Sequence, residues 1–182
     1  WESEWNGGGN HGEKEAVNLD EILKLLFNVS NPLVIRLVNY FFHESYDANQ
    51  ECKVDFPNTE SIGVDLGLLR SDLLIQVESA PVFHIEFQLN SSQNMAIRMF
   101  QYGFREIIKS NRDKENADIL WFPKQTVLYL EEGKGVYDDL SLRIVFPMTE
   151  IGELVVPYKV PVKKAWEIGK EEKIEKGLYS LL

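Results

Sequence analysis

The sequence has few cysteines and histidines and no long apolar run. Its one cysteine, Cys52, rules out a disulfide within these 182 residues, and with only three scattered histidines a structural zinc site is not expected. No stretch approaches the roughly 20 apolar residues of a membrane-spanning helix. The acidic, glycine-rich beginning lacks the pattern of a signal peptide. We therefore expect no membrane partner and a reducing, cytoplasmic location.

Positive charge is also scarce. The chain has 19 Lys and Arg residues and 29 Asp and Glu residues, which gives a formal net charge of −10. That balance argues against broad affinity for nucleic acid, because such affinity depends on neutralising phosphates. It still allows a local basic surface, or a cluster of acidic metal ligands that adds to the negative total. A content of 44% hydrophobic and 26% charged residues is typical of a globular domain with a core.

Residues 70–88 predict two short strands joined by a turn at 79–81. Alternation of side chains places Glu86 and Gln88 on one face of the second strand. If Asp72 of the first strand lies opposite Glu86, the two carboxylates are about 4.5–5.5 Å apart at Cβ. Carboxylates that close repel each other unless a proton or a cation lies between them. A divalent metal ion with oxygen ligands is the natural cation.

The rest of the chain predicts a mixed α/β domain. Hydrophobic spacing and capping residues predict helices over residues 19–27, 31–42, 93–110 and 163–182. Alternating or continuous apolar residues predict strands over 52–56, 62–66, 126–130, 140–146 and 154–160, the last two interrupted by Pro147 and Pro157. Residues 1–18 are expected to be flexible and 19–182 to form one domain. That domain is expected to continue past Leu182, because the chain stops on an apolar cluster.

The helix predicted at 93–110 carries two stripes. Its buried stripe is expected to consist of five apolar residues: Ile97, Phe100, Phe104, Ile107 and Ile108. A basic ridge recurs at helical spacing on another face: Arg98, Arg105, Lys109 and Arg112, with Gln101 and Tyr102 beside it. Such a ridge is either an ordinary solvated face or a set of phosphate contacts next to the two carboxylates.

Three segments resemble the PD-(D/E)XK nuclease superfamily, and within it the Rpn group of recombination-promoting, transposase-like nucleases. They are Arg-Ser-Asp-Leu at 70–73, His-Ile-Glu-Phe-Gln at 84–88 and Met-Ala-Ile-Arg-Met-Phe-Gln-Tyr-Gly at 95–103. The resemblance covers roughly residues 20–182. It implies a restriction-endonuclease-like αβββαβ core, with a central mixed four-stranded sheet flanked by helices. C-terminal strands and a helix would extend that core.

The resemblance also implies Mg²⁺-dependent hydrolysis of DNA, with Mn²⁺ as an alternative ion, in recombination or in mobile elements. Asp72 and Glu86 carry over as metal ligands, to which the backbone carbonyl of Phe87 is added. Gln88 takes the place of the usual lysine, and since an amide does not titrate it can only orient a water by hydrogen bonding. Four side chains are candidate nucleic-acid contacts: Arg98, Gln101, Tyr102 and Arg105. A homodimer would suit the superfamily.

Other interpretations remain open. Net acidity and the missing lysine favour a catalytically inactive relative that binds nucleic acid or protein. A glycosidase-like carboxylate pair lacks the aromatic sugar platform expected beside it. If the two acids form no functional site, Asp72 would form an ordinary ion pair with Arg70 or Arg98. Glu86 would then be an exposed acid on a sheet that is covered on one face only. His84 shares the face of Glu86, where a lone strand histidine usually packs or lies at the surface.

Overall fold

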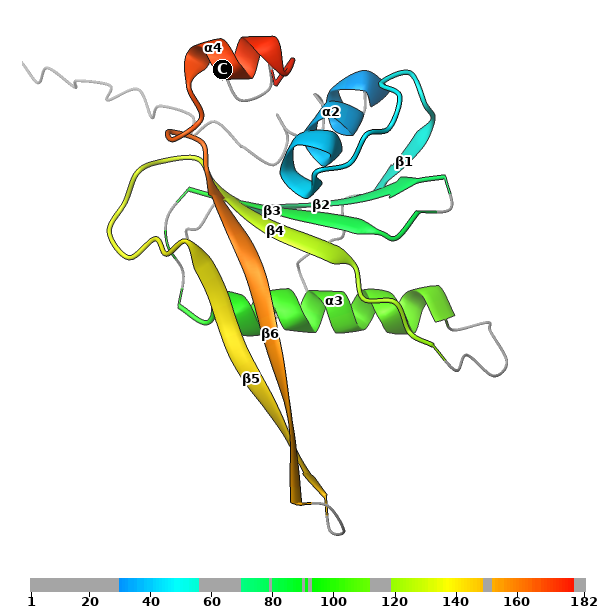
Figure 1. Cartoon of the computed structure of the whole chain (residues 1–182), viewed down its shortest axis with the longest axis vertical. Coiled ribbons are helices and arrows are strands. Elements are labelled where there is room, and N and C mark those ends of the chain that lie inside the picture. Colours follow the sequence, from blue (N-terminus) through cyan, green and yellow to red (C-terminus); the bar gives the residue numbers. More distant parts are fainter. Residues whose placement is uncertain are drawn as a thin grey trace, which may run out of the picture.

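A six-stranded mixed sheet with a helix on each face forms the body of the protein (Figure 1). The computed structural model describes residues 30–55, 70–78, 80–89, 91, 93–111, 119–148 and 152–178. For residues 70–72 it describes the backbone alone. The segments predicted at 1–18, 19–27 and 62–66 lie outside the described residues.

The elements follow one another as α2 (Asn31–Phe42), β1 (Cys52–Asp55), β2 (Arg70–Val77), β3 (Phe83–Gln88), α3 (Met95–Asn111), β4 (Lys124–Tyr129), β5 (Asp139–Met148), β6 (Gly152–Lys164) and α4 (Lys170–Glu175). The strand order in the sheet is β1-β2-β3-β4-β6-β5. Strand β3 is parallel to β4, and β4 is parallel to β6, while the other neighbours are antiparallel. The predicted α/β class is confirmed.

Helix α2 covers one face of the sheet. Pro32 stands in its first turn, where the missing N–H costs nothing. Its buried residues Val34, Leu37, Val38 and Phe41 join one core cluster with Phe83, Ile85 and Phe87 of β3. Burial of each such side chain contributes about 1.5–3 kcal/mol. The apolar half of β3 therefore faces α2, as its alternation predicts.

Helix α3 covers the other face, and its predicted buried stripe is wrong. Of the five residues predicted, only Ile107 is buried, whereas Ile97, Phe104 and Ile108 are 49%, 50% and 53% exposed. The helix is rotated relative to this prediction, and its small residue packs against the ring of Phe122, in the segment before β4: a Cβ added at Gly103 would lie 2.0 Å from Cε1 of Phe122. The buried side chains are instead Met95 and Met99, which pack on β4 and β6.

The C-terminal third also differs from the prediction. Strands β5 and β6 run through Pro147 and Pro157, because both lie in a two-stranded ribbon whose outer edges need no ladder hydrogen bonds. The helix predicted from residue 163 is wrong as well. Parallel pairing of Tyr129 with Lys164 keeps the chain in β6, and only the short α4 follows. Tertiary pairing here overrides helical propensity.

No helix among the residues that the structure describes is both long and apolar enough to span a membrane.

Candidate functional site

The hairpin has the register that the expected pair of carboxylates requires. In the antiparallel pair of β2 and β3, Asp72 is the Cα partner of Glu86, and Arg70 is the partner of Gln88. Directly opposed residues of an antiparallel pair share a face of the sheet. Glu86 and Gln88 lie at the carboxyl end of β3, beside the carboxyl end of the parallel strand β4. That edge is where open sheets with parallel strands usually bind ligands.

Glu86 is fully buried, so the alternative of an exposed acid on a one-sided sheet is wrong. Helix α3 covers it, and Nη2 of Arg98 donates a hydrogen bond to its Oε1 at 2.8 Å. Nε2 of Gln88 donates to the same oxygen. The side chain of Glu86 is 0% exposed and that of Arg98 is 15% exposed. A carboxylate so far from water is tolerated only when it is paired in this way.

Some polar atoms of this cluster remain open. Glu86 Oε2, Gln88 Oε1 and Arg98 Nη1 are buried and have no hydrogen-bond partner among the described residues. Glu86 Oε2 and the neighbouring position of Asp72 fit the all-oxygen ligand set that Mg²⁺ prefers, and Gln88 Oε1 beside them can accept a hydrogen bond. Within the part of the chain whose side chains are described, no group of three or more His, Cys, Asp or Glu is gathered for a metal. A metal site here would therefore depend on Asp72.

The backbone of Phe87, the third predicted ligand, lies in the middle of the sheet. Its Cα partners are Ser71 of β2 and Leu128 of β4. Its side chain belongs to the core cluster on the α2 face. The predicted ligand is its main-chain oxygen alone, and that role stays a prediction.

The predicted phosphate contacts separate into two groups. The guanidinium groups of Arg98 and Arg105 lie 5.7 and 5.5 Å from the centre of the Tyr102 ring, and Arg98 Nη2 is 3.3 Å from the Tyr102 hydroxyl. Arg98, Tyr102 and Arg105 therefore form a continuous row of contacts that leads from the buried Glu86 to the exposed Arg105. Gln101 is exposed, at helical spacing with the outward-facing residues Ile97 and Phe104, and does not join them.

A second polar cluster was missed by the sequence analysis. Nε2 of Gln125 donates to the backbone oxygen of Met99 at 2.8 Å and lies 2.9 Å from Nδ1 of His84. The Tyr158 hydroxyl donates to Oε1 of Gln125 at 2.5 Å, and burial raises the pKa of Tyr158. The rings of His84 and Tyr102 are in edge contact at 5.7 Å. The only signal in the sequence was one glutamine directly before the apolar strand predicted at 126–130.

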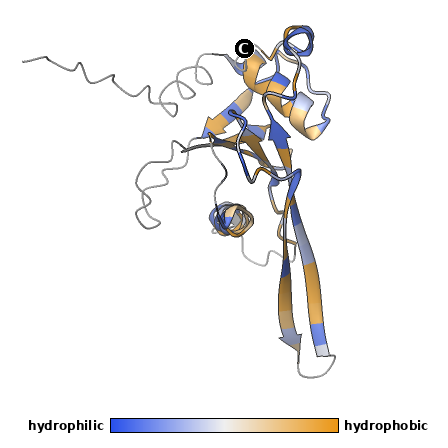
Figure 2. Ribbon diagram, turned by 90° about the vertical axis from the view of Figure 1, so that its left-hand side faces the viewer, coloured by the Kyte–Doolittle hydropathy of each residue, from blue (hydrophilic) through white to orange (hydrophobic). Residues whose placement is uncertain are grey.

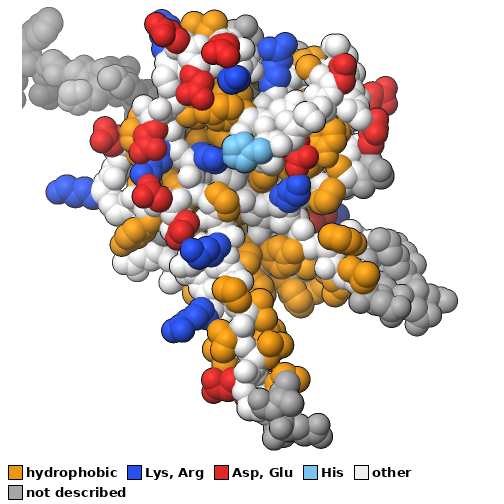
Figure 3. Space-filling view, viewed as in Figure 1, with side chains coloured by type: hydrophobic (Ala, Val, Ile, Leu, Met, Phe, Trp, Pro, Cys, Tyr) orange, Lys and Arg blue, Asp and Glu red, His pale blue; other side chains and the backbone are white. Residues whose placement is uncertain are grey.

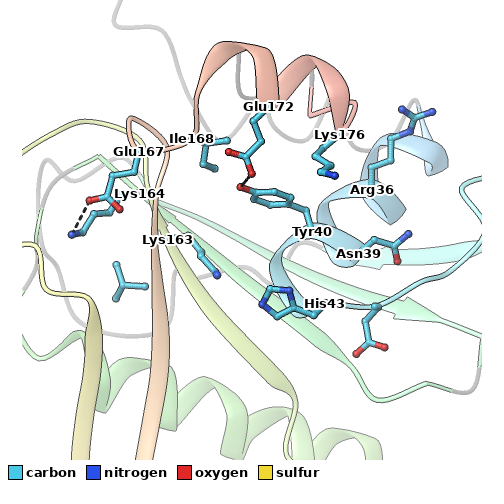
Figure 4. A pocket seen from close by; sticks show the side chains of 12 residues that line it. Arg36, Asn39, Tyr40, His43, Lys163, Lys164, Glu167, Ile168, Glu172 and Lys176 are labelled. Atoms are coloured by element: carbon cyan, nitrogen blue, oxygen red, sulfur yellow. Dashed lines mark hydrogen bonds and ion pairs between the residues drawn. The ribbon is translucent and has the colours of Figure 1, made fainter.

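On the α2 side, a cavity of about 800 Å³ lies between α2, the end of β6 and α4 (Figure 4). Its lining mixes charges of both signs. Lys164 pairs with Asp138 at 2.7 Å and with Glu167 at 3.2 Å. The Tyr40 hydroxyl donates to Glu172 at 2.9 Å, and burial together with that carboxylate raises the pKa of Tyr40 to about 12. None of these residues forms a recognisable motif in the sequence.

Comparison of the chain with protein-family models, with curated proteins and with solved structures gives no match. The functional interpretation therefore depends on the residues and on the geometry of the site.

Proposed function

We propose that this protein is a metal-dependent DNA endonuclease that acts through a cluster of Asp72, Glu86 and Gln88. The observation that carries the proposal is the register of β2 and β3, which pairs Asp72 with a buried Glu86 that keeps one carboxylate oxygen open among the described residues. A pure structural ion pair has no need of a second acid at the opposing position. Repulsion between two such acids is relieved by a bound cation.

The order of elements supports a restriction-endonuclease-like core. Elements α2, β1, β2, β3, α3 and β4 follow each other as αβββαβ. Strands β1 to β4 are consecutive neighbours in the sheet, three joined in antiparallel fashion and the fourth in parallel. Strands β6 and β5 extend this four-stranded unit beyond β4. In the proposal they are additions to the core, as is α4.

Asp72 and Glu86 would hold Mg²⁺, or Mn²⁺ in its place, with the backbone oxygen of Phe87 as a further ligand. When bound, such an ion lowers the pKa of a water and polarises a phosphoryl oxygen. Gln88 is held by the hydrogen bond from its Nε2 to Glu86, which leaves its Oε1 free to accept a hydrogen bond from a water. The amide does not take the proton itself, so Gln88 acts by orientation alone.

Arg98 supplies positive charge inside the cluster. One of its nitrogens binds Glu86, and its Nη1 has no partner among the described residues. A non-bridging phosphate oxygen is a suitable acceptor for Nη1, because hydrogen bonds between charged groups are the strong ones. Arg105, stacked on Tyr102 and exposed, would meet a phosphate farther along the DNA strand. Recombination or the movement of mobile elements is the proposed setting.

A catalytically inactive module that binds nucleic acid or protein is the second candidate. The 2.8 Å contact between Arg98 and Glu86 favours it, because the guanidinium already neutralises the carboxylate. The formal net charge of −10 also weighs against tight binding of DNA. The two candidates differ in one respect that can be measured, which is cleavage that depends on both acids.

Cleavage of supercoiled and linear DNA by the full chain tests the proposal, with Mg²⁺, with Mn²⁺ and with a chelator. We expect nicking only with metal, and a loss of roughly 100-fold or more in Asp72→Asn and in Glu86→Gln, since each substitution removes a ligand charge. Asp55→Asn is the matched control. Its carboxylate pairs with Lys109 at 3.1 Å on the surface, away from the cluster, so cleavage should persist.

Metal binding is measured separately by thermal unfolding. Mg²⁺ at about ten times its dissociation constant should stabilise the wild type by roughly 1.4 kcal/mol, and the two site variants by much less. Metal-dependent nicking that survives both substitutions refutes the site. A folded protein that cleaves neither DNA nor RNA supports the inactive module, whose affinity for DNA can then be measured as a function of salt.

A further inference from the structure

The cavity of about 800 Å³ between α2, β6 and α4 lies away from the acidic pair. Helices α2 and α4 are on one side of the sheet, and α3, which covers Glu86, is on the other (Figures 1 and 2). Cavities for small molecules usually have volumes of about 300–1,000 Å³. On this face of the molecule, basic, acidic and apolar side chains gather close together (Figure 3). The cavity is therefore a candidate for a second site, independent of the metal chemistry proposed at Glu86.

Lys163 stands at a position where packing alone favours an apolar residue. Its Cα partner in β4 is Leu128, whose own partner in β3 is Phe87, and both are fully buried in the core under α2. Partners in neighbouring strands share a face of the sheet, so Lys163 continues this apolar row. Its side chain is half-buried and has no hydrogen-bond or ion-pair partner among the described residues. A cation in such a place is unfavourable unless an anion compensates it.

His43 brings a second donor to the cavity from the end of α2. Figure 4 shows the side chains of His43 and Lys163 directed into the cavity, which both of them line. His43 has a φ of 57° and a ψ of 38°, a left-handed conformation in which glycine is the usual residue at the end of a helix. A residue with a Cβ is strained there, and such strain is typical of functional positions. Within the described part of the chain its imidazole has no hydrogen-bond partner.

Arg36 adds a further positive charge to the lining. Its guanidinium lies against the backbone of Gly177, where an added Cβ would come within 1.9 Å of its Nη1. No acidic residue that the structure describes pairs with it. In a chain with a formal net charge of −10, two cations without a counterion in one cavity are unusual.

The acidic residues of the cavity are arranged differently. Glu44 and Glu167 each pair with a lysine, so their charges are compensated. Glu172 accepts a hydrogen bond at 2.9 Å from the hydroxyl of Tyr40, which is neutral near pH 7 because its pKa is raised to about 12. Glu172 therefore keeps its charge and can accept hydrogen bonds from further hydroxyl groups. The lining offers cationic donors at one place and an anionic acceptor at another.

We propose that this cavity binds a small phosphorylated molecule that also carries hydroxyl groups, of the size of a sugar phosphate. A phosphate group has a charge of about −1.5 to −2 at pH 7, which matches the uncompensated cations. Lys163 and His43 contact the phosphate, Arg36 adds positive potential, and Glu172 accepts hydrogen bonds from the hydroxyl groups. Duplex DNA is a poor alternative, because the cavity is too small to admit it and the acids along its lining repel a long polyanion.

Isothermal titration calorimetry of the full chain tests the proposal, with ribose 5-phosphate as the probe. We expect one site per chain. Ribose, which lacks the phosphate, should not bind, and inorganic phosphate, which lacks the hydroxyl groups, should bind roughly tenfold more weakly.

Lys163→Met should weaken binding of the probe by roughly tenfold or more, since a charge-assisted hydrogen bond is lost. Without the probe, this variant should melt at the same temperature as the wild type or higher, because an apolar side chain replaces an uncompensated cation on an apolar face. His43→Gly should also weaken binding while the protein stays folded by circular dichroism, because glycine suits the left-handed conformation.

Lys159→Met is the matched control. Alternation places Lys159 on the same face of β6 as Lys163, but its side chain is 69% exposed, pairs with Asp139 at 3.5 Å and does not line the cavity. Binding of the probe should be nearly unchanged in this variant. A wild-type chain that does not bind ribose 5-phosphate overturns the proposal, and so does a loss in Lys159→Met as large as that in Lys163→Met. Tighter binding of citrate, whose anionic groups are all carboxylates, would overturn the assignment to phosphate. Displacement of the probe by duplex DNA would assign the cavity to nucleic acid instead.

Discussion

Replacing Arg98 by methionine removes the only described cation beside the buried Glu86. The substitution keeps most of the length and apolar stem of the side chain, so packing under α3 changes little. It leaves the carboxylate, which is 0% exposed, with the amide of Gln88 as its only described donor. A buried charge without its counterion is costly because water no longer solvates it.

The expected cost follows from the burial of the pair. Breaking a buried ion pair by removing one partner destabilises a protein by about 3–5 kcal/mol. For a chain of this length each kcal/mol lowers the melting temperature by roughly 2–4 °C, so Arg98→Met should melt at least about 6 °C below the wild type. Lys109→Met is the control. Its ion pair with Asp55 is 60% and 48% exposed, and such pairs contribute about 1 kcal/mol or less.

Urea unfolding followed by tryptophan fluorescence measures these free energies, since the chain has four tryptophans. Glu86→Gln and the double variant with both substitutions complete a double-mutant cycle. We expect the double variant to lose less free energy of unfolding than the sum of the two single losses, by about 2 kcal/mol or more. Repeating the cycle with Mg²⁺ adds the functional test. Arg98→Met should gain more stability from Mg²⁺ than the wild type does, because the guanidinium no longer competes for the carboxylate.

Two results would refute this reasoning. A cost below about 1 kcal/mol for Arg98→Met, similar to that of Lys109→Met, would mean that the pair is solvated rather than buried. An equal response to Mg²⁺ in Arg98→Met and Glu86→Gln would mean that Glu86 does not bind the ion.

Two further predictions concern packing and pH. Gly103→Ala should lower the free energy of unfolding in urea by about 1–3 kcal/mol, because the new Cβ would lie 2.0 Å from Cε1 of Phe122. Gly133→Ala is the control, since an added Cβ there meets nothing within 4 Å. Equal free energies of unfolding for the two variants would contradict the close packing at Gly103. Burial, together with the hydrogen bond to Glu172, raises the pKa of Tyr40 from 10.0 to about 12. The neutral phenol therefore stabilises the folded state below pH 10, and this contribution to the free energy of unfolding is lost as the pH rises from 10 to 12. Tyr40→Phe should flatten that decline, and an absorbance titration that places the phenol near its ordinary pKa would contradict it.

Local patterns predicted the hairpin well. Strict alternation in β3 separates the core residues Phe83, Ile85 and Phe87 from the polar row with Glu86, and the structure has this division. Alternation allowed, but did not fix, the register that pairs Asp72 with Glu86, and the structure has that register. These features depend on residues close together in the sequence.

Features that depend on distant contacts were not predicted. The orientation of α3 is consistent with two contacts outside the helix, that of Gly103 with Phe122 and the ion pair of Arg98 with Glu86, and helical spacing contains neither. The spacing of Ile97, Phe104 and Ile108 is as regular as that of a buried stripe, yet these residues face outward. Hydrophobic periodicity identifies an apolar side of a helix, but it does not say whether the chain itself or a partner covers it.

The position of Arg98 has a consequence for the order in which the protein folds. Strand β3 must pair with β4 across a long connection, since the contacting residues His84 and Gln125 are 41 residues apart, and closing so long a loop is slow. Arg98 follows Glu86 by only 12 residues. The guanidinium can therefore reach the acid while β4 is still unpaired, so Glu86 need not enter the forming interior as a lone charge. We expect Arg98→Met to slow refolding in stopped-flow fluorescence, and an effect on unfolding alone would place the contact after the rate-limiting step.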